Sequence, residues 1–227
     1  MARTITKFLD FGKLARVNGG AAVIALAMVY NDLLTVNWAL GRFNEAKASL
    51  PNHMHKGMRI YFSRIHNGHL AEGLKAVQKI RDNRTLRRIV SGCSSDAQEA
   101  FKALCRCLPG GADASDFNRY IGQIRHRVAF HCDVSYLRWG IKNRVARTNA
   151  STATLTAGGT VQSNRFEFVD DLLDTVVCRK VWNMEEGVNR RNEADRIGSW
   201  CDKKAREHLR FAGEFVEMAL SRSGSLY

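Results

Sequence analysis

The sequence has few prolines and comparatively few acidic residues. Only 2 of its 227 residues are proline, which disfavours the turn-rich sandwiches and barrels of all-β proteins. Leucine, alanine, arginine and lysine are abundant instead, and these residues have a high helix propensity. The composition therefore predicts an all-α protein.

Signatures of several other protein classes are also missing. There is no glycine-rich phosphate loop, no zinc-finger spacing and no internal repeat. The six cysteines lack the signal peptide and the dense spacing of a secreted disulfide framework. Cys105 and Cys107 form a CxC pair with no second cysteine or histidine pair at ligand spacing. We expect reduced thiols in a cytoplasmic protein that needs no metal and no other cofactor.

The longest apolar run has ten residues, AAVIALAMVY, from Ala21 to Tyr30. Asn31, Asp32 and Asn37 follow it, and each would be costly at the centre of a bilayer. We therefore expect a buried core helix that ends before Pro51, and no membrane association.

Positive charge is in large excess. Lysine and arginine number 35 against 22 aspartates and glutamates, which gives a formal net charge of +13 and a pI of about 9.8. Such a surplus favours a phosphate-rich partner such as RNA, although general solubility or an anionic membrane surface would also account for it. Arg84, Arg87 and Arg88 fall on one helical turn, as a solvated face or as contacts to RNA phosphates.

Helical periodicity covers most of the chain. We expect a single all-α domain over residues 1–227, with a main bundle at 18–147 and C-terminal helices at 165–227. Residues 148–164 are small and polar, and either a small β-hairpin or a loop insertion is consistent with them. The individual helices are predicted at 21–50, 55–80, from 95 or 96 to 108, from 115 or 116 into the window described below, and at 134–147, 166–181 and 193–221.

Several polar clusters have only weak claims to a function. Ser95 or Asp96 with Glu99 matches a capping box, and Ser115 or Asp116 is expected to cap the next helix. His66 and His69 are three residues apart without further ligands nearby, so we interpret them as surface or capping residues. The acidic patch Asp170, Asp171 and Asp174 is more typical of a helix start than of a metal site.

One short window is different. Residues Gly122 to Asp133 read GQIRHRVAFHCD and combine two arginines, two histidines, a cysteine and an aspartate with apolar residues. Cleavage of RNA without a metal needs a base near the 2′-hydroxyl, an acid for the leaving 5′-oxygen and a cation for the charge on phosphorus. Histidine titrates near neutrality and suits the first two roles, whereas arginine remains charged and holds phosphate in a bidentate manner.

The same window resembles the R-x(4–6)-H motif of the HEPN superfamily of helical ribonucleases and nucleotide-binding domains. The resemblance covers about fifteen residues, in which Arg125 matches the motif arginine, His126 the polar residue after it and His131 the motif histidine. Arg127 is not part of the motif, and we expect it to contact nucleic acid. The resemblance implies a HEPN-like bundle of at least four helices, a homodimer with two motifs facing one cleft, and metal-independent endoribonuclease activity. Toxin–antitoxin or phage-defence systems, with an antitoxin or defence partner, would be the setting.

Helix geometry limits what one copy of the window can do. On a straight helix, Arg125 and His131 would lie about 9 Å apart along the axis and about 120° apart around it. A kink, a long reach by the arginine or a second subunit would have to bring them together. Two alternatives remain open: an ordinary surface pair of Arg127 and His131 supported by Asp133, and a non-catalytic RNA- or nucleotide-binding module.

Overall fold

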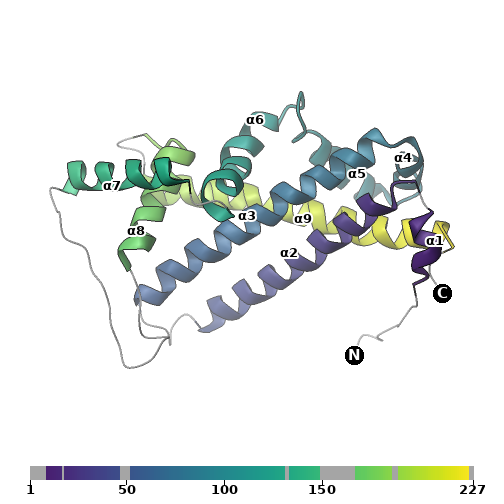
Figure 1. Ribbon diagram of the computed structural model, residues 1–227, viewed down its shortest axis with the longest axis horizontal. Helices are drawn as coiled ribbons and strands as arrows, with labels where there is room; N and C mark the ends of the chain where they lie inside the picture. Colours follow the sequence, from purple (N-terminus) through teal and green to yellow (C-terminus); the bar gives the residue numbers. More distant parts are fainter. Residues whose placement is uncertain are drawn as a thin grey trace. The chain divides into compact units, whose positions relative to one another are not determined.

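The computed structural model describes residues 9–16, 18–46, 52–130, 133–148, 167–185 and 189–224. Helices take up 85% of these described residues, and no strand occurs among them (Figure 1). The predicted all-α fold is therefore confirmed. Of the predicted loop or hairpin at 148–164, only Thr148 is described, and it is the last residue of a helix; the rest lies outside the described residues.

The helices follow the predicted periodicity closely. The first five are α1 (Phe11–Ala15), α2 (Gly20–Ala46), α3 (Asn52–Asp82), α4 (Arg84–Val90) and α5 (Ser95–Cys105). The later ones are α6 (Ala114–Phe117), the π-helical turns η2 (Asn118–Gly122) and η3 (Arg125–Ala129), α7 (Val134–Thr148), α8 (Glu167–Thr175), the π-helical turn η5 (Val176–Val181) and α9 (Arg190–Arg222).

The chain divides into two compact units. Unit 1 comprises Met1–Leu34, Glu72–Ala114 and Lys203–Tyr227, and unit 2 comprises Thr35–Ala71 and Ser115–Asp202. Helices α2, α3 and α9 each contribute a segment to both units. The predicted single domain with boundaries at 148 and 165 stays a prediction.

Unit 1 has an aromatic and aliphatic core. Phe211 of α9 lies between Phe101 of α5 and Phe215, at ring-centroid distances of 4.8 Å and 5.0 Å. Aliphatic side chains from four helices are also fully buried in unit 1, namely Leu26, Leu33, Ile80, Leu86 and Leu104. Because apolar burial is the main favourable term in folding, this cluster holds unit 1 together.

A charged network also lies in unit 1. Lys204 is only 3% exposed, and its ammonium group donates to Asp113 at 3.2 Å and to Glu207 at 3.0 Å. Arg106 donates to the other oxygen of Asp113 at 2.8 Å. Burial opposes ionisation, but the hydrogen bonds from Lys204 and Arg106 lower the pKa of Asp113. The buried lysine is therefore fully compensated by charged partners.

Two helix starts differ from the prediction. Helix α5 begins at Ser95, and Ser94 is its cap, because the Ser94 hydroxyl accepts from the amide of Ala97 at 3.3 Å. Glu214 of α9 accepts from the backbone amide of Ser94 at 2.5 Å and from its hydroxyl at 2.6 Å, so a distant carboxylate takes the place expected for Glu99. The predicted caps Ser115 and Asp116 lie inside α6, which begins at Ala114. The cap predictions at Ser95 or Asp96 and at Ser115 or Asp116 were wrong by one to three residues.

Helix α2 is apolar on more than one face. Val23, Leu26 and Leu33 are buried, as expected for a core helix, but Met28 is 61% and Trp38 is 68% exposed. Among the described helices, α2 is the one that is long and apolar enough to cross a membrane, by length and composition only. The expected core helix therefore buries one face and leaves apolar side chains on another.

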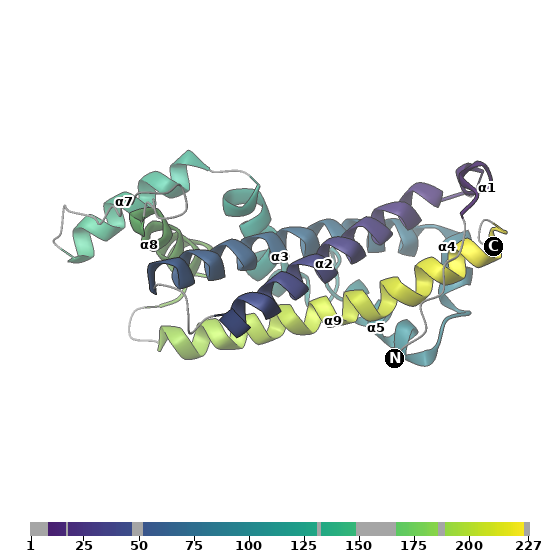
Figure 2. The same cartoon turned by 90° about the horizontal axis from the view of Figure 1, so that it is seen from below.

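Unit 2 contains all the π-helical turns of the described chain. Helices α7 and α8 and the turn η5 pack together (Figures 1 and 2). Gly140 of α7 allows this close approach, because a β-carbon there would lie within 2.8 Å of the side chains of Leu172 and Val176. The indole nitrogen of Trp182 donates to the carbonyl of Tyr120 at 3.2 Å and joins η5 to η2. Single π-helical turns of this kind are frequent at functional sites.

Candidate nucleic-acid interface

The window from Gly122 to Asp133 begins in η2 and continues through η3 in unit 2. Ile124 and Val128 form its buried face together with the preceding Ile121, and all three are at most 2% exposed. Arg125 is half-buried, whereas His126 and Arg127 are exposed. The apolar residues therefore hold the window in the core, and its basic residues remain accessible.

Helix α3 supports the end of η3. A guanidinium nitrogen of Arg64 donates to the carbonyl of Ala129 at 3.3 Å. The ring of Phe130 lies against Gly68, where a β-carbon would come within 2.6 Å of it, and meets the ring of His69 edge-on at a centroid distance of 6.2 Å. Gly68 thus provides the space in which Phe130 lies on α3.

Asp133 anchors the chain at the start of α7. It accepts from the hydroxyl of Ser135 at 2.6 Å and from the backbone amide of Ser135 at 2.9 Å. Arg127 donates to its other carboxylate oxygen at 2.7 Å. The Ser135 hydroxyl and then Arg127 lower the pKa of Asp133 and keep it ionised. Asp133 thereby ties the start of α7 to η3.

Arg125 and His126 are brought together at the start of η3. Their side chains are 3.1 Å apart, between Nη1 of the arginine and Nδ1 of the histidine. Because a guanidinium group can only donate, Nδ1 of His126 must accept, and the proton of the neutral ring then lies on Nε2. This pair thus combines a permanent cation with an imidazole whose Nε2 carries the proton.

The other predicted site residues have different positions. His131 lies outside the described residues, between Phe130 and Asp133, whose side chains are both held. The turn η3 ends at Ala129. Arg127 forms the ion pair with Asp133 that the surface-pair alternative requires. Arg84, Arg87 and Arg88 are exposed on α4 in unit 1.

Sequence reasoning missed the contribution of α3. His66, expected at the surface, is buried, and burial lowers its pKa although Asp202 opposes the shift. His69 contacts Phe130 instead of capping a helix. The only signal of this contact in the sequence was a spacing that places Arg64, Gly68 and His69 toward one side of α3. It does not reveal which element they meet.

A second group of basic and aromatic side chains lies beside the window in unit 2. Arg127 lies over the ring of Tyr136 at 5.2 Å, and Lys180 lies 5.8 Å from the same ring and 5.6 Å from that of Trp139. Basic groups stacked on aromatic rings are typical of surfaces that bind single-stranded nucleic acid.

The three aspartates of the acidic patch on α8 lie in different surroundings. Asp171 forms an ion pair with Arg144 at 3.0 Å, while Asp170 and Asp174 line two different pockets. Within the described ranges, no group of three or more histidine, cysteine or acidic side chains could hold a metal ion.

Comparison with known proteins gives no match, since no family model, no curated protein and no solved structure is similar to this chain. A functional interpretation therefore depends on the residues and their geometry.

Proposed function

We propose that the protein is a metal-independent endoribonuclease of the HEPN type that acts in the cytoplasm as a homodimer, in a toxin–antitoxin or phage-defence setting. The observation that carries the proposal is the contact between Arg125 and His126 on an accessible turn. That turn ends shortly before His131, the third residue of the motif. The net charge of +13 suits a protein that binds RNA.

The supports around the window favour catalysis over a loose surface contact. Arg64 and Gly68 hold the end of η3, and Asp133 holds the start of α7. The chain is therefore anchored on both sides of His131. Efficient catalysis requires that reacting groups be held in place before the substrate arrives.

The reaction needs no group beyond those in the window. In the proposed step the 2′-oxygen of RNA forms a bond to phosphorus while the bond to the 5′-oxygen breaks. One histidine takes the 2′-hydroxyl proton and another group supplies a proton to the leaving 5′-oxygen. His131 fills one of these roles, His126 shares the proton transfer or orients the phosphate, and Arg125 stabilises its developing charge. The products carry a 2′,3′-cyclic phosphate and a 5′-hydroxyl.

Purified protein incubated with total RNA tests this proposal. The wild type should cleave RNA in EDTA, and His131→Ala should slow cleavage by about 1000-fold. Arg87→Gln is the matched control, because Arg87 is exposed on α4, outside the window, and is predicted to contact RNA phosphates. It should weaken RNA binding and lower the salt dependence by about one charge, while the maximal rate stays unchanged. Undiminished cleavage by a folded His131→Ala variant would contradict the assignment.

A non-catalytic RNA-binding module is the second candidate. The stacked cations of Arg127 and Lys180 on Tyr136 and Trp139 favour it, since they provide a binding surface without a reacting group. Under this alternative RNA is retained in a salt-sensitive manner, and no 2′,3′-cyclic phosphate forms even after long incubation.

A further inference from the structure

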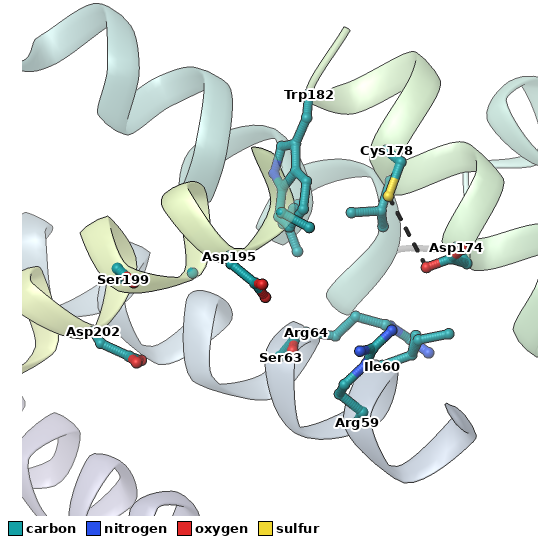
Figure 3. Close-up of a pocket in the computed structure, with 14 residues that line it drawn as sticks. Arg59, Ile60, Ser63, Arg64, Asp174, Cys178, Trp182, Asp195, Ser199 and Asp202 are labelled. Carbon is teal, nitrogen blue, oxygen red and sulfur yellow. Dashed lines mark hydrogen bonds between the residues drawn. The ribbon is translucent and has the colours of Figure 1, made fainter. Parts of the chain in front are cut away.

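A pocket of about 440 Å³ lies entirely within unit 2 (Figure 3). Its walls come from α3, from α8 with η5, and from the first turns of α9. A volume of this order is typical of sites that bind small molecules. The proposed cleavage of RNA does not use this pocket.

Two walls of the pocket carry opposite charges. Arg59 and Arg64 project from α3, and Asp195 and Asp202 project from α9 (Figure 3). Among the described residues, none of these four side chains takes part in a salt bridge. Arginine and aspartate side chains that line one cavity would ordinarily pair. Asp174 of α8, which lies 4.0 Å from the thiol of Cys178, also lines the pocket. The α3 wall thus offers two cations to an anionic group, and the α9 wall offers carboxylates to a cationic group.

Arg64 gives a further sign of a missing partner. One of its terminal nitrogens donates to the carbonyl of Ala129, but its Nε is buried and has no hydrogen-bond acceptor among the described residues. A buried donor without an acceptor costs free energy. An anionic group in the pocket would satisfy it.

The pocket also has an apolar part and open space. Ile60, Ile124, Val177 and Trp182 contribute to its lining. Gly198 of α9 borders open space. A β-carbon at this position would meet no described atom within 4 Å, apart from those of its own stretch of helix. A ligand with an apolar body therefore fits between the charged walls.

We propose that this pocket binds a small zwitterion with a bulky apolar body, such as a free amino acid with an aromatic side chain. Its carboxylate lies at Arg59 and Arg64, its amine lies at Asp195, and its side chain contacts Trp182 and Ile124. The charges of such a ligand complement both walls, which a purely anionic or purely cationic ligand does not. Neither Arg125 nor His126 is among the described residues that line the pocket, whereas Arg64 and Ile124 connect it to the window.

Calorimetric titration with L-phenylalanine and L-tryptophan tests the proposal. The wild type should bind at least one of them, and about tenfold more tightly than the analogue that lacks the amine, 3-phenylpropanoate or 3-indolepropanoate. The analogue that lacks the carboxylate, phenethylamine or tryptamine, should be weakened by a similar factor. If neither amino acid shows saturable binding at about 10 mM, the proposal is overturned.

Exposed charges on the two walls allow a sharper test. Asp195→Asn should abolish the preference for the amino acid over the analogue without the amine. Arg59→Gln should abolish the preference over the analogue without the carboxylate. A variant that weakens all three ligands equally would contradict the assigned orientation, because a general structural effect does not distinguish the two charges.

A pair of glycine variants locates the site. Gly198→Leu fills the pocket and should weaken binding by at least about tenfold. Gly41→Leu is the matched control, because Gly41 is also a helical glycine whose β-carbon would meet no described atom within 4 Å, but it does not line the pocket. Binding that survives Gly198→Leu unchanged would place the ligand elsewhere and overturn the proposal.

Discussion

Lys204 in unit 1 and Arg64 in unit 2 are both basic residues withdrawn from solvent, but their surroundings differ. Lys204 donates to Asp113 and Glu207, and Asp113 has Arg106 as a second partner. Arg64 donates to one carbonyl, and its Nε has no acceptor among the described residues. Charges that are fully paired stabilise a fold, whereas charges held apart around a cavity are available to a ligand.

Removing the paired charge should have the largest effect. Lys204→Met keeps the aliphatic chain but leaves Glu207 without its partner and Asp113 with Arg106 alone, and we expect the free energy of unfolding to fall by about 3 kcal/mol. Lys75→Met is the control. Lys75 pairs with Glu72 at 3.0 Å in the same i,i+3 manner as Lys204 with Glu207, but both partners are exposed. It should cost less than about 1 kcal/mol in urea denaturation. Equal losses of unfolding free energy from Lys204→Met and Lys75→Met would contradict the expected difference between a buried and an exposed ion pair.

A buried histidine in unit 1 should make stability depend on pH. Burial lowers the pKa of His208 to about 4, whereas an unfolded histidine titrates near 6.5. Below about pH 6.5 the unfolded chain binds a proton that the folded chain does not. The free energy of unfolding is therefore at its full value above about pH 6.5, and it falls by about 2 kcal/mol as the pH drops to about 5.

Denaturation of variants at several pH values measures this effect. His208→Leu should remove most of the pH dependence between about pH 6.5 and about pH 5. His66→Leu in unit 2 is the comparison, because burial also lowers the pKa of His66 but Asp202 opposes the shift. The His66→Leu substitution should remove less of the pH dependence of stability than His208→Leu does. A larger effect from His66 would show that Asp202 does not offset its burial.

Removing an unpaired charge from unit 2 should have the smallest effect. Asp195 and Arg59 are exposed, and neither forms a salt bridge within the described chain. We expect Asp195→Asn and Arg59→Gln each to change the free energy of unfolding by less than about 0.5 kcal/mol. A loss as large as that of Lys204→Met would mean that these residues maintain the fold and are not reserved for a ligand.

The fold was largely predictable from local patterns. Apolar spacing located α2, α3, α7 and α9 within a few residues, because helical periodicity is a property of neighbouring residues. The caps were less predictable. Ser94, and not Ser95, caps α5 in the structure, because Glu214, which is distant in the sequence, accepts a hydrogen bond from the hydroxyl of Ser94. The two units draw on separate stretches of the chain, which local periodicity does not reveal.

The candidate interface was predictable where its residues are contiguous. Arg125 and His126 were identified from the sequence, and the structure places their side chains in contact; their part in a motif stays a prediction. Arg64 and Gly68 were not identified, because nothing local distinguishes a helical arginine or glycine that meets another element from one that does not. One alternative had Asp133 helping to hold Arg127 or His131, and the structure pairs Asp133 with Arg127; His131 lies outside the described residues.

The sequence by itself determined the all-α fold, the basic character and the location of the polar window, since each follows from composition or from residues close along the chain. Only the tertiary structure decided that His66 is buried and that Phe130 lies on Gly68. It also decided that opposite charges line one pocket without pairing. The physical reason is that burial and pairing depend on which helix faces meet, and this is set by packing between distant segments.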